Sequence, residues 1–588
     1  MKITHKINRS SISMNTKKDS ENLNFLLTNK LGGYCMLSSA PSSKYQGVFM
    51  MHKEEMYKII EDISPVNSQN ITEITNSFSF IKRKRKSLTE KFFMPYGYDA
   101  LVYELNKQSP VKITLDMRAS YSNPEFGREY RISKTGSKII IRYQHEKTKL
   151  YLAIKPDKEK FEKIEKWIKR SYKHDQKRNS PHEKYVYKAL KLDASKIVFA
   201  FSKKRKQAIE EADYVYKNLK RLKDHQKIYV NNINTKKTRN KKTKIAKKCA
   251  INSLNKLVIN LKNKRGIFAG LPWFFQFWSR DELISLKALL LNKQNREVKD
   301  ILIKNLKIIK YGKLPNLSFP RSDSSNADSI GWFFKRIDDS LDIFSKKEKE
   351  KISKKLAASI KHINKNHLRN KLVHNNPNET WMDTEWDSDN REGFRIEIQA
   401  LFLNMLKLAY KLTKDKKYMH QEKELKNKVK AKFWNGKMLA DGLGDFTVRP
   451  NVFIAAYIYP DLLTKTEWTS CFKNILPKLW LGWGGFSSID KSHHLYCSDY
   501  TGESDQSYHR GDSWFWINNL AALVMVKTNK THFKKYIKKI LDASTEEILT
   551  SGALGHHAEV SSSSKLRSEG CLAQAWSDAM FIELIEEV

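Results

Sequence analysis

A run of acidic side chains stands out in the second half of the sequence. Residues 380–406, TWMDTEWDSDNREGFRIEIQALFLNML, place five carboxylates within a dozen positions beside two tryptophans and then continue into an apolar helical pattern. Paired carboxyl groups can hydrolyse a bond when one protonates the leaving oxygen and the other activates water. Surface turns are also rich in Asp and Asn, so this stretch alone fits a solvated turn as well as half of a hydrolytic site.

Other loops combine aromatic rings with charged side chains. They are AGLPWFFQFWSRDE (269–282), FTVRPN (446–451), YHRGDSWFW (508–516) and GALGHHAEV (552–560). Charges beside aromatic rings are costly to bury unless a ligand or a partner satisfies them. A sugar does so, because it offers an apolar face to a ring and hydroxyls to carboxylates, amides and arginine. The loops therefore indicate a carbohydrate site, with Glu559 or Glu569 as the second carboxylate.

The first part of the chain has the pattern of strands. From about residue 20 to 205, short β-branched and aromatic runs alternate with Gly, Pro, Asn or charged turns, which predicts an antiparallel β-sandwich. A helical insertion is expected at KFEKIEKWIKRSYK, residues 160–173. The expected strands include residues 77–81, 99–105, 111–117, 138–143, 149–154 and 196–201.

The second part has the pattern of helices. From about residue 246 onward, apolar residues recur at i, i+3, i+4 and i+7, and the length suits about twelve helices. We expect an all-α toroid of helical hairpins. A basic, helix-compatible stretch separates the two patterns, so the predicted domains are 1–205, a linker at 206–245, and 246–588.

The chain is strongly basic, with 109 Lys and Arg against 64 Asp and Glu and a net charge of +45. Such an excess attracts polyanions. The lysines are spread along the chain, however, and the two dense runs, Lys82–Lys86 and Lys236–Lys248, are of a kind that usually forms solvated loops. Nucleic acid is therefore not an expected partner.

Cysteine usage and hydropathy indicate a cytoplasmic protein. The five cysteines are widely separated and lack a CxxC pair, which favours reduced thiols. We expect neither a signal peptide nor a membrane span, because no apolar run reaches about 20 residues. His556 and His557, like His493 and His494, have no third ligand at a recognisable spacing, so no metal is expected.

The loops resemble, in order, the motifs of glycogen debranching enzymes of the amylo-alpha-1,6-glucosidase family. GIFAGLPWFFQFWSRDELISL resembles AGYPWF…WGRD, and TWMD with REGFRIEIQAL resembles WMD…R.G..VEINAL. FWNGKMLADG with VRPN resembles FW…L.D…RPNQ, and YHRGDSWFW resembles YH.GTVWPW. GHHAEV with SEGCLAQAWSDAMFIEL resembles SE…GC.AQAWS.AELLR. Near the N-terminus, FLLTNKLGGYCMLSS with SKYQGVFM resembles WL.TNGLGGYASGT…RKYHGLLV.

This resemblance implies a β-rich N-terminal domain followed by an (α/α)6 toroid of the six-hairpin glycosidase type. It also implies an inverting hydrolase that needs no cofactor and releases glucose from α-1,6 branch points of glycogen or a branched oligosaccharide. Asp383 matches the general acid and Glu559 the general base. The residues that match the sugar-binding pocket are Trp273, Phe274, Arg280, Asp281, Trp381, Arg391, Glu397, His509, Trp514, Gln574 and Trp576.

The sequence departs from the family pattern at several positions. Ser279 replaces Gly in WGRD, Val452 replaces Gln in RPNQ, and Gln46 replaces His in the N-terminal motif. Asp512 adds a carboxylate near the expected pocket. The alternatives are a glucoamylase-like α-1,4-exoglucosidase or a trehalase on the same fold, and a catalytically silent glycan-binding protein.

Overall fold

The structure, a computed structural model, describes residues 3–7, 12–16, 23–38, 41–66, 70–231, 233, 238, 240–261, 264–322 and 326–588. The chain forms two compact units. The β unit comprises Met1–Asn234, Asn255–Asn263 and Ile548–His556, and the helical unit comprises Thr235–Leu254, Lys264–Glu547 and His557–Val588. The domain borders predicted from the sequence stay predictions, and the basic run from Lys236 to Lys248 lies partly outside the described residues, as does much of the N-terminal segment.

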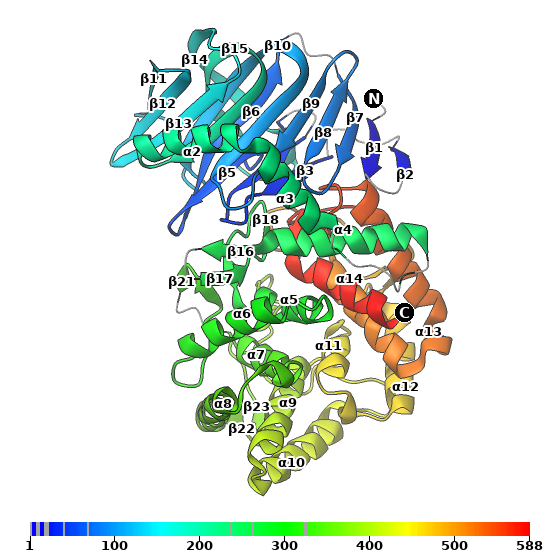
Figure 1. Ribbon diagram of the computed structural model, residues 1–588. Helices are drawn as coiled ribbons and strands as arrows, with labels where there is room; N and C mark the ends of the chain where they lie inside the picture. Colours follow the sequence, from blue (N-terminus) through cyan, green and yellow to red (C-terminus); the bar gives the residue numbers. More distant parts are fainter. Residues whose placement is uncertain are drawn as a thin grey trace. The chain divides into compact units, whose positions relative to one another are not determined.

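The β unit is built on one fifteen-stranded sheet (Figure 1). Its strands are β1 (Ile3–Ile7), β2 (Ile12–Thr16), β3 (Phe25–Thr28), β4 (Tyr34–Leu37), β5 (Gly47–His52), β6 (Glu55–Pro65), β7 (Ile71–Asn76), β8 (Ile81–Arg85), β9 (Thr89–Phe93), β10 (Ala100–Ala119), β11 (Glu129–Thr135), β12 (Lys138–His145), β13 (Thr148–Pro156), β14 (Phe161–Ser171) and β15 (Glu183–Ser202). The short strand β16 (Val258–Leu261) and the helices α1 (Lys173–Lys177), α2 (Arg205–Lys217) and α3 (Leu219–Asn231) also belong to this unit.

Two long strands turn this sheet into a sandwich. β10 and β15 pair with each other, and each changes its outer partner midway. β10 pairs first with β9 and then with β6, whereas β15 pairs first with β14 and then with β13. Two layers result, and side chains from both, such as Phe25, Ile63, Leu101 and Ile141, share one buried core. The predicted antiparallel β-sandwich is confirmed.

Helix α2 covers part of the outer face of the sheet. It buries Ala208, Ala212 and Val215 against Val102 and Val198. Small side chains at a helical spacing let the helix backbone approach the sheet closely, which explains why this segment folds onto strands although it has few large apolar residues.

The expected helix at residues 160–173 is wrong, because most of this segment is strand β14. Phe161, Ile164 and Ile168 have helical spacing, but β13 reaches only the second half of β15, and β14 supplies the hydrogen-bond partners that the first half needs. Trp167 of β14 packs against Tyr187, with ring centroids 5.1 Å apart. The expected strand at 77–81 is also mostly a turn, since β8 begins at Ile81.

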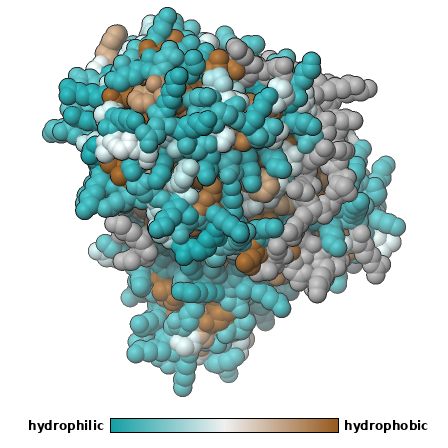
Figure 2. Space-filling view, turned by 45° about the horizontal axis from the view of Figure 1, so that its top comes forward, coloured by the Kyte–Doolittle hydropathy of each residue, from teal (hydrophilic) through white to brown (hydrophobic). Residues whose placement is uncertain are grey.

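The basic run at Lys82–Lys86 alternates between the two faces of β8. Lys82, Lys84 and Lys86 are exposed, whereas Arg83 and Arg85 are buried. Both arginines pair with the buried carboxylate of Glu90, at 2.6 Å and 2.8 Å. Arg83 and Arg85 of this run are therefore part of the core, which argues against a nucleic-acid-binding face here. On the face drawn in Figure 2, hydrophilic side chains predominate, as expected for scattered lysines.

The helical unit contains most of the helices in the described part of the chain. They are α4 (Lys241–Leu257), whose last turn belongs to the β unit, α5 (Ser279–Leu291), α6 (Asn295–Ile308), α7 (Ser329–Asp338), α8 (Lys346–Asn366), α9 (Ile396–Thr413), α10 (Lys416–Phe433), α11 (Asn451–Ile458), α12 (Lys465–Leu479), α13 (Phe515–Thr550) and α14 (Ala575–Glu587), with 3₁₀ turns η2 (Leu341–Ile343) and η3 (Pro460–Leu462). Its short strands are β17 (Lys264–Ile267), β18 (Gly270–Leu271), β19 (Phe277–Trp278), β20 (Leu317–Phe319), β21 (Arg321–Ser322), β22 (Leu368–Arg369), β23 (Leu372–Val373), β24 (Trp480–Leu481), β25 (Gly485–Phe486), β26 (Ser513–Trp514), β27 (Val560–Ser561) and β28 (Ala573–Gln574).

Burial separates the helices into an inner and an outer ring. α5, α7, α9, α11 and α14 are buried on nearly every side; α5 buries ten of its 13 residues. α6, α8, α10 and α12 bury one stripe each; α10 buries four of 18 residues. α13 is two helices joined at Asn529, and its first part is buried like the inner helices. The alternation of inner and outer helices is that of an (α/α)6 toroid, as predicted.

Because an outer helix returns the chain after each inner one, the inner helices all begin at the same end of the toroid. The loops that lead into α5, α9, α11, α13 and α14 are those singled out in the sequence. Among the described helices, none is both long and apolar enough to cross a membrane.

We expect Glu90→Ala to lower the free energy of unfolding of the β unit by about 3 kcal/mol, because two buried guanidinium groups lose their carboxylate. Glu129→Ala, an exposed glutamate on β11, is the matched control. Calorimetric unfolding of both variants tests this. Equal unfolding temperatures in the two variants would contradict the role assigned to Glu90.

Candidate active site

Short ladders join the loops at the N-terminal ends of the inner helices. β18 pairs with β28, so Gly270 lies opposite Gln574, and β26 pairs with β27, so Trp514 lies opposite Val560. The N–H of Ile396 donates to the carbonyl of Asp441 at 3.0 Å. Segments up to 300 residues apart in sequence thus meet at one end of the toroid.

Arg280 holds Asp383 in place. Its Nη1 donates to Asp383 at 2.9 Å, its Nε to Asp328 at 2.6 Å and its Nη2 to the carbonyl of Thr380 at 2.8 Å. Arg280 is buried, whereas the Asp383 side chain is 36% exposed. Asp383 therefore has a fixed orientation and still remains open to a ligand.

Glu559 lies in a buried, hydrogen-bonded position. The Tyr508 hydroxyl donates to its Oε1 at 2.5 Å, and the Cys571 N–H donates to its Oε2 at 2.9 Å. A side chain at position 570, where the backbone φ is +63°, would displace this carboxylate, because a Cβ there would lie 2.5 Å from Oε2. Glu569 is more exposed and has Arg567 at 3.9 Å, so burial distinguishes Glu559 from Glu569.

Asp281 connects the two candidate carboxylates electrostatically. Its pKa is raised to about 8, chiefly by burial and also by the charges of Glu559 and Asp383, against the opposing effect of Arg280. Gln574 donates to its Oδ1 at 3.0 Å. At neutral pH Asp281 is therefore mainly protonated. Asp383 and Glu559 both influence the pKa of this carboxyl group, and Arg280, the chain neighbour of Asp281, holds Asp383.

Arg391 and Glu397 are bound to each other. Arg391 donates to both Glu397 oxygens, at 2.6 Å and 3.3 Å, to Asp441 at 2.8 Å and to the Thr380 hydroxyl at 2.8 Å. Asp441 in turn accepts a hydrogen bond from Asn451. Because these buried groups satisfy one another, we expect Arg391 and Glu397 to position the loop of Asp383.

Buried aromatic rings pack together near Asp383 and Glu559. Trp381 makes edge contacts with His509, Trp514 and Trp516, with ring centroids 5.5, 5.3 and 5.1 Å away. Trp514 stacks on His509 at 5.1 Å, and Trp576 stacks on Trp516 at 5.0 Å. The pKa of His509 lies well below its usual value because of burial and nearby arginines, so the ring is neutral.

Trp273, Phe274 and Asp512 are the remaining residues that the sequence analysis placed at or near the site. Trp273 and Phe274 are half-buried in the loop between β18 and β19, next to the ladder that holds Gln574. Asp512 is buried, and burial raises its pKa well above the usual value, although the Ser507 hydroxyl donates to it at 2.8 Å. The extra carboxyl group is therefore buried and held by a hydrogen bond from Ser507.

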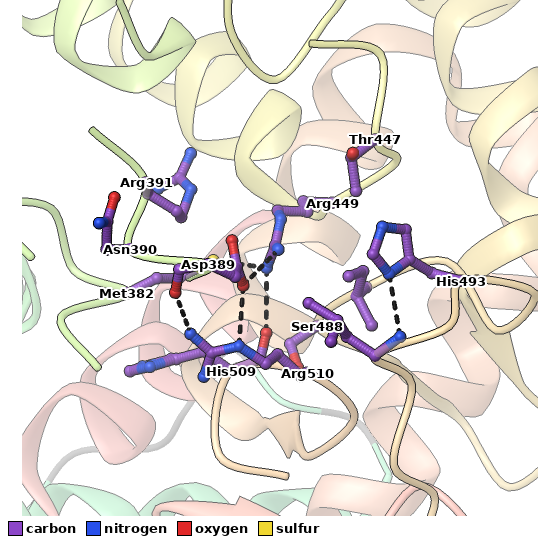
Figure 3. Close-up of polar contacts among 12 residues, drawn as sticks. Met382, Asp389, Asn390, Arg391, Thr447, Arg449, Ser488, His493, His509 and Arg510 are labelled. Atoms are coloured by element: carbon purple, nitrogen blue, oxygen red, sulfur yellow. Dashed lines mark hydrogen bonds and ion pairs between the residues drawn. The ribbon is translucent and has the colours of Figure 1, made fainter. Parts of the chain in front are cut away.

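Asp389 fixes the far end of the acidic segment. Its carboxylate accepts from Arg449 at 2.8 Å and forms an ion pair with Arg510 at 2.8 Å (Figure 3). Arg510 also donates to the carbonyl of Thr384 at 2.8 Å, and the Thr384 hydroxyl hydrogen-bonds to His509. The segment that carries Asp383 is thus anchored on both sides.

Several important residues were not predicted from the sequence. Tyr508 and Arg449 stand inside quoted motifs, so their positions were visible although their roles were not. Asp441 likewise stands in a quoted motif, FWNGKMLADG, whereas Asp328 lies outside every quoted motif and nothing in its local sequence marks it. They become recognisable only through their contacts with Arg280 and Arg391.

Among the described residues, no group of three or more His, Cys, Asp or Glu side chains is arranged to hold a metal ion. His557 instead pairs with Glu547 at 2.7 Å.

A family model described as amylo-alpha-1,6-glucosidase matches residues 251–583, more than half of the chain. The chain belongs to this family. As a member of this family, it is a glycoside hydrolase. No curated protein matches the sequence.

A solved bacterial glucoamylase, crystallised in complex with acarbose, has the same fold. The superposition has a TM-score of 0.66 at 12% identity and covers 97% of this chain and 96% of that chain. At this identity the likeness concerns the fold alone, and it supports the β domain followed by an (α/α)6 toroid.

Burial of protonated Asp281 predicts a pH-dependent stability. The unfolded state loses this proton near pH 4, but the folded state keeps it until about pH 8. The folded state binds more protons in this window, so this group's contribution to stability falls as the pH rises from about 4 to about 8. Asp281→Asn should reduce the drop in unfolding temperature between pH 5 and pH 8. The control variant Asp387→Asn, at an exposed position, should leave this drop unchanged. An identical drop in the wild type and both variants would refute the prediction.

Loss of the Asp389 carboxylate should destabilise the acidic segment. Asp389→Ala leaves Arg449 and Arg510 without their shared partner, and we expect a loss of about 2 kcal/mol in the free energy of unfolding of the helical unit. Limited proteolysis should cut within 383–392 sooner than in wild type. Asp387→Ala, two residues away and exposed, is the control, and equal cleavage rates would contradict the role of Asp389.

Proposed function

We propose that this protein is an exo-acting α-1,6-glucosidase that removes single glucose units from branch points of glycogen or a related α-glucan. The observation that carries the proposal is a pair of fixed carboxylates: Arg280 holds Asp383, and Tyr508 holds Glu559. Aromatic contacts connect them, since the Tyr508 ring contacts Trp514 and Trp514 contacts Trp381. Family membership supports the α-1,6 linkage, and the glucoamylase bound to acarbose supports an oligosaccharide ligand.

Asp383 acts as the general acid. Its exposed carboxyl group can reach the O6 atom that leaves, and Arg280 sets its orientation. It gives its proton to O6 as the C1–O6 bond breaks, so that the shortened glucan departs with a neutral hydroxyl.

Glu559 acts as the general base. Tyr508 and the Cys571 N–H orient its carboxylate, and it takes a proton from a water molecule on the opposite face of the sugar. The water oxygen bonds to C1 and inverts the configuration, so the α-linkage yields β-glucose. Each carboxyl group then exchanges its proton with solvent.

The terminal glucose is held by the surrounding residues. Trp381, Trp514 and Trp576 supply apolar surface, and protonated Asp281 can donate to or accept from a hydroxyl. Trp273 and Phe274, in the loop between β18 and β19, are expected to contact the glucose as well. Gln574 orients Asp281 by donating a hydrogen bond to its Oδ1.

Substitution of either carboxyl group should nearly abolish glucose release. Asp383→Asn and Glu559→Gln remove the acid and the base, and each should lower kcat about 100-fold or more. Glu385→Gln, exposed in the same loop, and Glu569→Gln should retain near wild-type rates. A fully active Glu559→Gln with an inactive Glu569→Gln would move the base to Glu569.

A panel of substrates tests the linkage. Panose should release glucose from its α-1,6 end faster than maltotriose or trehalose does. Faster release from maltotriose would favour the α-1,4-exoglucosidase alternative, and faster release from trehalose would favour a trehalase. Affinity for glycogen without turnover of any substrate would favour a glycan-binding protein.

A further inference from the structure

The helical unit contains a cavity at the end of the toroid opposite the loops of Asp383 and Glu559. Its volume is about 610 Å³. It is lined by the later turns of all the inner helices, from Lys287 on α5 to Glu583 on α14, and by the segment 456–468. Asp383 and Glu559 precede inner helices, whereas this cavity lies where those helices end, about 10 Å or more along their axes.

A buried polar network forms one wall of the cavity. Arg336 of α7 donates to the Leu283 carbonyl of α5 at 2.9 Å and to the Tyr457 hydroxyl of α11 at 3.0 Å. Tyr457 donates to Oε2 of Glu583 on α14 at 2.8 Å. Four inner helices are linked by this chain of hydrogen bonds, so the wall is rigid and preformed.

Two buried side chains of the wall have polar atoms without protein partners among the described residues. These atoms are Oε1 of Glu583 and Nδ2 of Asn404, and each residue is 4% exposed. Both residues line the cavity. Leaving such an acceptor and donor unsatisfied is unfavourable, so the cavity suits a ligand that can both donate and accept hydrogen bonds.

The charged groups around the cavity largely neutralise one another. Lys335 pairs with Asp339 at 2.8 Å, Lys407 with Asp461 at 2.6 Å and Lys527 with Glu587 at 3.2 Å. The lining holds five lysines and five acidic residues. A phosphate or another strong anion would have to break these pairs, and a neutral ligand would not.

We propose that this cavity binds a neutral carbohydrate of one or two sugar units, as a second site separate from the catalytic one. A sugar hydroxyl can donate to Glu583 and another can accept from Asn404. Tyr457 and Trp468 in the lining provide aromatic surface for a pyranose. The volume lies within the range of small-molecule sites. This inference concerns binding alone and does not depend on the catalytic assignment.

Calorimetric titration with maltose tests the proposal. The background is Asp383→Asn, which keeps the sugar intact. We expect two maltose molecules per chain, falling to one when Asn404→Leu removes the donor or Thr528→Trp fills the cavity. If the catalytic end does not bind maltose, the same variants should change the stoichiometry from one to zero.

Control measurements make the outcome decisive. Asn427→Leu, an exposed asparagine on the outer helix α10, should leave the stoichiometry unchanged. In the wild-type background, Asn404→Leu and Thr528→Trp should keep glucose release from panose within about twofold, which also shows that they fold. Unchanged maltose stoichiometry in both cavity variants would overturn the proposal.

Discussion

The site depends on a single guanidinium group in the interior of the toroid. Arg280 opens α5, and its donors reach the N-terminal cap residue of α7, the Thr380 carbonyl and Asp383. A buried arginine with two carboxylates and a carbonyl is stable only if all partners are in place, since removal of one leaves a charge uncompensated. The position of the proposed acid is therefore coupled to the correct packing of three inner-ring segments.

The other charged clusters extend this principle. Arg391, Glu397 and Asp441 hold the segment before Asp383, and Asp389 with its two arginines holds the segment after it. Five acidic residues in one loop would repel each other if all were free. Asp383 and Asp389 are paired with arginines, and Glu385, Asp387 and Glu392 are exposed to solvent, so their mutual repulsion is reduced.

Much of this arrangement could be predicted from the sequence, and the failures have physical reasons. Helical periodicity predicts the toroid because each outer helix has one apolar stripe, and the motif order brings out Asp383, Glu559 and the tryptophans. The segment 160–173 was predicted as a helix because its apolar spacing suits one. It forms a strand because the first half of β15 needs a hydrogen-bonded neighbour. Arg83 and Arg85 look like part of a basic patch in the sequence. They point inward because side chains alternate along a strand, and a run of like charges does not reveal this alternation. Asp328 is unmarked in the sequence, and the role of Asp441, although it stands in a quoted motif, becomes clear only when the fold places it against Arg391.

The central claim is that Asp383 and Glu559 face each other across one sugar. A crystal structure with bound glucose or an iminosugar tests it most directly, by the distance between the two carboxyl groups and their positions around the anomeric carbon. The account predicts one group on each face at about 6.5–9.5 Å, with room for a water molecule beside Glu559. A separation near 5 Å, or a sugar that contacts neither residue, would contradict it.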